Sequence, residues 1–478
     1  MINEEKRNKT ARPGMCRMEE NMRKKFLRNV SAAAVVSAAV LAVGGCKGNS
    51  GQTETSAVQT EASTEAAEEE SSAVPETKED ENGAGTESVK NDQPSENHKA
   101  YLKEYFEVEV GENPDAASFL EDLKKVAGDE IPPLEGELTW ASAVQAAVSA
   151  ADYEELALSY PKEKTTERLK AHGIGEGDVE EAYQAALACA LDVSLISEED
   201  GKRAAAGEGF TAADEERLLM KVAEANGDGR NYLGRASQPE IYGKLDQAWN
   251  SFIIFDDGQL SQVGKEAVEQ QVSTGYGIKS AAYNARFLPE LTLQYGHSDI
   301  KHAHQLIGLL NSEDIDAKVQ LEPKISIYQY LLEWGPVPEA TPTYEVKQFG
   351  DLYLVYAVEY DLMLEFDNTE DMLRFDSVIN DFAKKNEGNE EAVGLIYGSW
   401  WQPLYSTTRT DMPEDAYHQM FDCVVTNGIY SIHPFALPEN KDFVIEKLKE
   451  MSDGLEVEAV ERYCNTAFYH YLKGEDYQ

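Results

Sequence analysis

Apolar residues recur three and four positions apart through residues 100–230, and this spacing predicts amphipathic helices. Leu120, Leu123 and Val126 share one helix face in the first clear example. Two of the apolar runs follow a threonine, a residue type that commonly caps helix N-termini, and these are Thr139 and Thr211. Residues 100–230 are therefore predicted to form a mostly helical domain.

The pattern changes after a short helical connector, which we place at residues 231–285. From residue 286 to residue 478, strand-like apolar runs alternate with helical ones. Residues 352–366 alternate as a half-buried strand does, and residues 369–382 have helical spacing. Two similar but weaker strand–helix–strand units flank them. The predicted fold class is α+β, in which a mostly helical N-terminal domain precedes an α+β domain of repeated strand–helix–strand units of ferredoxin-like type.

Residues 47–99 differ in composition from both of these regions. They contain 13 acidic residues and 4 lysines and no aromatic residue. Such a segment cannot bury enough apolar surface to offset the entropy lost on ordering. We expect a disordered, extended, acidic linker.

The N-terminal region combines a basic cluster, an apolar run and a small-residue site. Arg23, Lys24 and Lys25 precede residues 30–43, which are almost all Ala and Val, and Val43-Gly44-Gly45-Cys46 follows. The apolar run is too short to span a bilayer. The order resembles a bacterial lipoprotein signal peptide over residues 22–46, whose final four residues form the lipobox. An ordinary secretory signal is the alternative, and residues 1–21 are an expected upstream extension.

The resemblance implies that Cys46 is the lipidation site and the first residue of the mature protein. One acyl chain holds a protein only marginally, whereas the diacylglycerol of a lipoprotein cysteine supplies the two chains that stable anchoring needs. The expected location is extracytoplasmic, on the bacterial cell surface, with the chain attached to the membrane by its lipid.

Part of the helical region resembles an S-layer homology (SLH) repeat. Ala190–Ile196, a glycine-containing loop and Phe210-Thr211-Ala212-Ala213-Asp214 follow its helix–loop–helix order, and a weaker echo begins at Leu138. SLH domains bind anionic cell-wall polymers largely through a motif arginine. Ala212 occupies that position here and Trp140 occupies it in the echo. The resemblance therefore supports the helical fold more than it supports polymer binding.

Charge narrows the classes of partner. Residues 100–478 contain 71 acidic and 30 basic residues, a net charge of −41. Phosphate binding needs clustered Lys and Arg, so nucleic acid is not an expected partner. The membrane, through the lipid on Cys46, is an expected partner, and cell-wall polymer, a glycan or a surface protein are the other candidates.

Aromatic residues supply the candidate ligand contacts. Trp400 and Trp401 follow Tyr397 and precede Tyr405, and Tyr328, Tyr330 and Trp334 extend the aromatic-rich group. Flat rings can stack on sugar faces. Two adjacent tryptophans on a strand would point to opposite faces, so one of them could face outward.

Metal and disulfide chemistry have weak signals. His302 and His304 lie on opposite sides of a predicted helix, so with His297 they do not predict a metal centre. A loop at residues 224–229 has some calcium-loop positions, but Arg235 stands where a bidentate glutamate is required. Pairing of Cys423 with Cys464 is left open by the sequence.

The sequence contains no GxSxG, Walker or HExxH motif, and no catalytic residue and no cofactor is predicted. The leading hypothesis is a non-catalytic binding or interaction protein of the cell surface. The alternative is a cell-wall or polysaccharide hydrolase that uses a pair of carboxylates.

Overall fold

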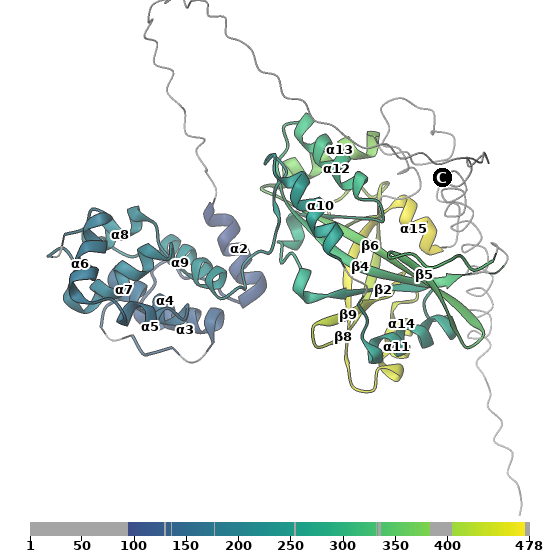
Figure 1. Cartoon of the computed structure of the whole chain (residues 1–478), viewed down its shortest axis with the longest axis horizontal. Helices are drawn as coiled ribbons and strands as arrows, with labels where there is room; N and C mark the ends of the chain where they lie inside the picture. Colours follow the sequence, from purple (N-terminus) through teal and green to yellow (C-terminus); the bar gives the residue numbers. More distant parts are fainter. Residues whose placement is uncertain are drawn as a thin grey trace, which may run out of the picture.

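The computed structural model describes residues 94–473 apart from 129–130, 135, 176, 253–254, 331, 333–335 and 383–403. Within them, a cluster of helices lies beside a helix-covered β-sheet (Figure 1). The helical cluster contains α2 (Pro94–Phe106), α3 (Ala116–Ala127), α4 (Trp140–Ala150), α5 (Glu154–Leu158), α6 (Lys162–Ala171), α7 (Glu181–Asp192), α8 (Glu198–Ala205) and α9 (Ala212–Ala225).

Local capping explains where several of these helices begin. Thr139 accepts a hydrogen bond from the backbone N–H of Ser142, and the Ser142 side chain bonds back to Thr139, which completes a capping box for α4. Thr211 and Asp214 form the same arrangement at α9. Both predicted N-caps are confirmed. The apolar faces then meet in one core in which Trp140 is 2% exposed.

The second region contains the strands and six further helices. The strands are β1 (Gly234–Arg235), β2 (Gly275–Ser280), β3 (Thr292–His297), β4 (Ala317–Tyr330), β5 (Tyr344–Phe349), β6 (Leu352–Phe366), β7 (Leu404–Thr407), β8 (Tyr417–Asn427), β9 (Tyr430–His433), β10 (Phe435–Ala436) and β11 (Glu456–Asn465). The helices are α10 (Ile241–Ser251), α11 (Gly258–Glu269), α12 (Ile300–Ser312), α13 (Thr369–Phe382), α14 (Lys441–Met451) and α15 (Thr466–Lys473), with short 3-10 turns η1 (Ala281–Tyr283) and η2 (Pro289–Leu291).

Eight of these strands form a closed antiparallel barrel. Their order is β4-β2-β9-β8-β11-β7-β3-β6, and β6 pairs with β4 to complete the ring. The closing pair is the longest one and runs from Ala317 opposite Phe366 to Tyr330 opposite Tyr353. Strands β1, β5 and β10 pair with β4, β6 and β8 respectively.

The predicted ferredoxin-like strand–helix–strand repeats are therefore wrong. The long strands β4 and β6 each have different neighbours along their length: β4 pairs with β1 near its start and β2 near its end, and β6 pairs with β5 and then with β3. Strands from all three predicted units thus enter one ring. The order of helices and strands along the chain does not specify these long-range pairings.

The helices cover the outer face of the barrel in two groups. Helices α10, α12 and α13 share one apolar cluster with β3, the start of β4 and the end of β6. Helices α11 and α14 share another with β2, β8 and β9. A closed ring of eight strands encloses one face of the sheet, and these two clusters pack on the other face. The alternate residues of each strand, on the face opposite these clusters, therefore point inward.

The helical cluster contacts the barrel through named side chains. The Tyr105 hydroxyl of α2 donates to the carbonyl of Phe287, just before β3, at 2.6 Å. Leu288 and Leu291, next to β3, belong to the apolar core of the helical cluster.

None of the helices in the described part of the chain combines the length and apolarity needed to cross a membrane.

Candidate functional site in the barrel interior

Strand β4 shows why the inside of the barrel is polar. Val319 and Leu321 point to the outer helices, whereas Lys318, Glu322 and Lys324 belong to the inward set. Each inward residue of β4 lies opposite an inward residue of β6, so that Glu322 is paired in register with Asp361 and Lys324 with Glu359. A two-residue alternation thus delivers charged side chains to a shared interior.

A network of four charged groups from three strands occupies this interior. The Lys279 ammonium of β2 lies 2.5 Å from Asp361 and 3.5 Å from Glu322. The Lys324 ammonium lies 2.7 Å from the other oxygen of Asp361. Asp361 is fully buried, while the side chains of Lys279 and Lys324 keep 20% and 11% of their exposure. Solvent therefore reaches the lysines but not the carboxylate between them.

Asp361 and Lys279 stay ionised at neutral pH. Burial alone would raise the pKa of Asp361, but the ammonium groups of Lys279 and Lys324 outweigh burial and hold it well below its ordinary value. Burial would likewise lower the pKa of Lys279, but Asp361 and Glu322 raise it. Removing any one of these side chains should be strongly destabilising, because it would leave a partner as an uncompensated buried charge.

Beside this network, three side chains form a hydrogen-bonded relay. Ser431 Oγ lies 2.8 Å from His433 Nε2, and His433 Nδ1 lies 2.9 Å from Asp422 Oδ2. Ser431 and His433 are two residues apart on β9 and so share a face, and Asp422 lies on the neighbouring strand β8. Lys279 is the register partner of Ser431 on the other side of β9. The relay therefore adjoins the charged network.

Tyrosines gather around the end of β4. Tyr330 is buried, and Tyr328, Tyr344 and Tyr353 pack with it and with Val355. By register, these positions belong to the inward set or to its continuation onto β5. Tyr328 and Tyr330 thus lie together, whereas Trp334 lies outside the described residues, so the larger aromatic group stays a prediction.

The last helix, α15, packs against the inward side of β8. The ring of Tyr469 stacks on His418 with centroids 4.3 Å apart, and Phe468 meets Phe435 edge-on at 5.5 Å. Thr466 also bonds through its Oγ1 to His418 Nε2 at 3.0 Å. Because Asp422 lies opposite Phe435 in register, α15 provides aromatic cover beside the relay.

Of the other residues predicted for the ligand site, the structure describes Tyr405 alone. Tyr397, Trp400 and Trp401 lie outside the described residues, as does Cys46. Tyr405 lies on β7, where its register partner is Tyr295. Tyr295 faces the outer helices and bonds through its hydroxyl to His302 of α12 at 2.8 Å.

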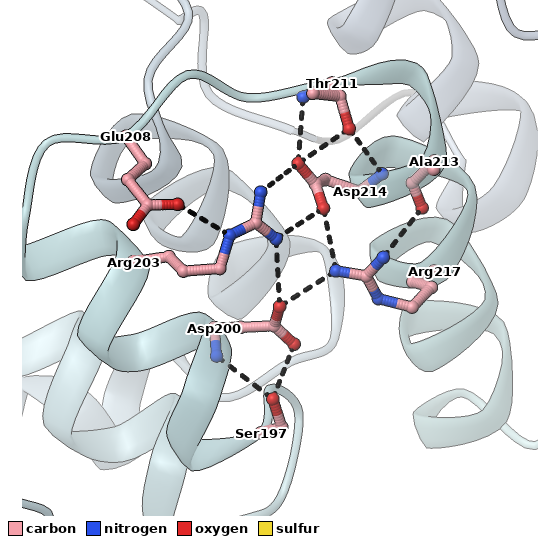
Figure 2. Close-up of polar contacts among 8 residues, drawn as sticks. All are labelled: Ser197, Asp200, Arg203, Glu208, Thr211, Ala213, Asp214 and Arg217. Atoms are coloured by element: carbon pink, nitrogen blue, oxygen red, sulfur yellow. Dashed lines mark hydrogen bonds and ion pairs between the residues drawn. The ribbon is translucent and has the colours of Figure 1, made fainter. Parts of the chain in front are cut away.

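The SLH-like motif folds into an ion-pair cluster that joins α8 to α9 (Figure 2). Arg203 donates to both oxygens of Asp214 at 2.7 and 3.0 Å, and Arg217 donates to Asp214 at 2.7 Å and to Asp200 at 2.8 Å. Although burial would raise it, bonds from Arg203 and Thr211 lower the pKa of Asp214 to about 2. These ion pairs hold α8 against α9.

The motif's arginine positions offer no cation to a wall polymer. Trp140 is 2% exposed and packs edge-on against Phe210 with centroids 5.0 Å apart. Ala212 is the first residue of α9.

The histidines and cysteines considered for metal binding or a disulfide do not come together in one site. His302 stacks on His297 with ring centroids 3.7 Å apart, whereas His304 pairs with Asp246 at 3.1 Å, as expected for opposite sides of a helix. Within the described ranges, no group of three or more His, Cys, Asp or Glu side chains could hold a metal ion. Cys423 and Cys464 are buried free thiols, so they do not pair.

No protein-family model, no curated protein and no solved structure matches this chain.

Sequence reasoning missed the interior cluster, although a signal was present. Lys318, Glu322 and Lys324 alternate with apolar residues along β4. Such alternation is typical of a strand with one face in water. Only closure of the ring turns that polar face into an interior.

Proposed function

We propose that this chain is a lipid-anchored, extracytoplasmic binding protein of the bacterial cell surface whose barrel interior receives a polar ligand of carbohydrate type. The supporting observation is that Lys324 and Asp361, with Lys279 paired to Asp361, lie on the same inward face of β4 and β6 as the tyrosine group at the end of β4. Ligand sites of this kind combine aromatic surfaces with a few placed polar groups.

The chemistry of a sugar suits both parts of this interior. Its apolar face stacks on flat rings such as those of Tyr328 and Tyr353, and its hydroxyl groups donate to carboxylates and accept from ammonium groups. Because the cations and anions of the network are paired with each other, a neutral or zwitterionic ligand fits better than a strongly charged one.

Location is proposed from the signal segment that ends at Cys46. The acidic balance of residues 100–478 supports a folded part that stays away from anionic lipid headgroups and is tethered by the lipid alone. In this proposal the barrel contacts the glycan and the SLH-like helices do not, since both motif positions that would hold arginine hold other residues, Ala212 and Trp140.

A carboxylate-based hydrolase has less support. Such an enzyme needs an acid with a raised pKa beside an ionised partner in reach of substrate. In the barrel, Asp361 has a lowered pKa. Burial, with the nearby charges of Asp122 and Glu216, raises the pKa of Glu215 to about 7, but Glu215 is 1% exposed within the helical cluster. It cannot meet a polysaccharide there.

The test is retention of the detergent-solubilised full-length protein on immobilised cell-wall glycan fractions. The Tyr328→Ala variant should lose about tenfold or more of the wild-type affinity, because one stacked ring accounts for roughly 1–2 kcal/mol. Tyr232→Ala removes a 45%-exposed ring outside the barrel and should bind within about twofold of wild type. Absence of wild-type retention would overturn the proposal.

A further inference from the structure

We propose that Ser431 is a nucleophile for acyl transfer, with His433 as its general base and Asp422 as the residue that positions His433, and that the chain hydrolyses small polar carboxylic esters. This goes beyond glycan binding and does not depend on it. The geometry rests on two hydrogen bonds in series, 2.8 Å from Ser431 Oγ to His433 Nε2 and 2.9 Å from His433 Nδ1 to Asp422 Oδ2.

The relay assigns a role to each imidazole nitrogen. A carboxylate can only accept, so Nδ1 of His433 must donate its proton to Asp422. In the neutral ring, Nε2 is then the acceptor and receives the Ser431 hydroxyl proton. This is the tautomer that a serine nucleophile needs, because the base must be unprotonated on the side that faces the hydroxyl.

Asp422 is suited to stabilise the imidazolium that forms during the reaction. It is 8% exposed, and its Oδ1 atom is buried without a hydrogen bond to any described residue, so His433 is its direct partner. Burial would raise the pKa of Asp422, but the charge of His433 and the bond to it lower the pKa instead. The carboxylate thus stays ionised and can accept the hydrogen bond from Nδ1 of His433 throughout the reaction.

The interior leaves room beside the relay. Gly277 of β2 lies opposite His433 in register, and a methyl group added to Gly277 would meet only the Lys324 side chain, at 3.8 Å. His433 keeps 16% of its side-chain exposure. A residue with a large side chain at position 277 would instead occupy the space next to the imidazole. In this proposal the small ester occupies the space beside the imidazole.

Lys279 is the nearest candidate for stabilising the negative charge that develops on the substrate. As the register partner of Ser431, its Cβ lies about 5 Å from that of Ser431. Its ammonium group stays protonated because Asp361 and Glu322 raise its pKa. A fixed cation beside the attacked carbonyl lowers the cost of the oxyanion.

The chemical steps balance with water as the only co-reactant. Ser431 Oγ attacks the ester carbonyl carbon while its proton passes to His433 Nε2. The tetrahedral intermediate collapses, the bond to the alkoxy oxygen breaks, and His433 gives the proton to the leaving alcohol. Water then attacks the acyl-serine, His433 takes its proton, and the acid leaves as Ser431 Oγ recovers a proton.

The polar surroundings indicate the class of ester. Lys279, Lys324 and Asp361 flank the relay, and a long alkyl chain would have to desolvate them. Short acyl groups on a polar alcohol avoid that cost. Acetate esters should therefore turn over faster than octanoate esters of the same leaving group.

The first experiment labels the full-length protein with a fluorophosphonate probe, which reacts with activated serines, and maps the adduct by peptide mass. Adduct on Ser431 is expected, and Ser431→Ala and His433→Ala should abolish it. Ser326→Ala is the matched control, since Ser326 also points inward but bonds to Glu359 at 2.6 Å and not to a histidine. Ser326→Ala should label as wild type does.

The second experiment measures hydrolysis of 4-methylumbelliferyl acetate. Ser431→Ala should lower kcat/KM about 100-fold or more, and Asp422→Asn should lower kcat about as much with little change in KM, because it favours the wrong tautomer. Ser326→Ala should stay within about twofold. Hydrolysis that persists in Ser431→Ala, or wild type that takes no label at Ser431, would overturn the proposal.

A thiol variant keeps the proposal testable if the alanine variants misfold. Ser431→Cys keeps the size of the side chain and should be alkylated by iodoacetamide at least tenfold faster than Ser326→Cys, because His433 can take the thiol proton. Equal rates in two variants with wild-type melting temperatures would also overturn it. Loss of glycan retention with Ser431 labelling intact would overturn only the binding proposal.

Discussion

Arg230 lies over the ring of Tyr101, with 4.3 Å between its guanidinium carbon and the ring centroid. The same guanidinium pairs with Glu365 of β6 at 2.8 Å, so a tyrosine of α2 and a carboxylate of the barrel share one cation. Lys318 also contacts Glu365, at 2.7 Å, and the backbone N–H of Leu288 donates to it at 2.6 Å. Glu365 therefore couples the helical cluster to the barrel.

Replacing Glu365 should destabilise the protein strongly. Glu365→Gln leaves the largely buried Arg230 without its carboxylate and removes the nearer of the two carboxylates that contact Lys318, so the free energy of unfolding should fall by about 3 kcal/mol. Urea unfolding measures it. Glu446→Gln, an exposed change on α14, should remain within about 0.5 kcal/mol of wild type. Equal effects of the two changes would contradict the coupling role.

Glu215 should make the protein less stable at alkaline pH. Burial, followed by the charges of Asp122 and Glu216, raises its pKa to about 7, and neither oxygen has a hydrogen-bond partner in the described structure. A raised folded-state pKa gives stability that is fully present below pH 4.5 and is lost as pH rises through 7. Glu215→Gln should therefore raise the free energy of unfolding by about 2 kcal/mol at pH 8 and change it little at pH 4.

Chemical unfolding of both proteins across this pH range measures the difference between them. Glu224→Gln, at a 48%-exposed position on the same helix, is the control and should show no comparable pH dependence. A Glu215→Gln effect that is the same at both pH values would contradict the titration.

His297 should make the protein less stable at acidic pH, the opposite of the effect of Glu215. Burial, followed by the positive charges of His302 and Lys324, lowers its pKa to about 3. Its contribution to stability is fully present above pH 6.5 and is lost as pH falls toward 3. Between these pH values the histidine is protonated in the unfolded chain but not in the folded one, and this favours unfolding. His297→Phe keeps a ring against His302 and cannot titrate. Its stability should fall less steeply than that of wild type between pH 6.5 and pH 4.5, as measured by urea unfolding; parallel curves would contradict this.

Cys46 should decide whether the protein stays with the membrane. Cys46→Ala removes the thiol that would receive diacylglycerol, and the chain should move from the membrane fraction to the soluble extracytoplasmic fraction, as measured by immunoblot after fractionation. Replacing the buried Cys189 with Ala should leave its distribution unchanged. Retention of the Cys46→Ala protein on membranes would contradict the lipobox interpretation.

Local features of the fold could be predicted from the sequence. The alternation of residues 352–366 gives β6, the helical spacing of residues 369–382 gives α13, and Thr139 and Thr211 cap the helices they precede. Each depends on neighbours within a few positions in the chain. Such short-range information is present in the hydropathy pattern itself.

The barrel could not be predicted in the same way. Ala317 and Phe366 are 49 positions apart and meet only because β4 and β6 pair along their whole length. Strand pairing depends on side-chain packing across the sheet more than on backbone preference. Repeated strand–helix–strand order therefore remained compatible with separate units, and the closed ring was missed.

The interior site was missed for a related reason. Ser431 and His433 stand two positions apart near the end of a predicted strand run, which places them on one face but does not say what that face meets. Asp422 joins them only through the hairpin of β8 with β9, and Lys279 comes from more than 150 positions earlier in the chain. Tyr397, Trp400 and Trp401 remain predictions.

Strand β11 lies between β8 and β7, and Glu456–Asn465 pairs along its whole length with β8. The ring therefore stays open until residue 465 has been synthesised. During synthesis, the facing edges of β8 and β7 stay unpaired until β11 is available, and long-range pairing of this kind is slow. Truncation before residue 456 would release an open sheet prone to aggregation, so Glu456–Asn465 determines when the barrel can first close.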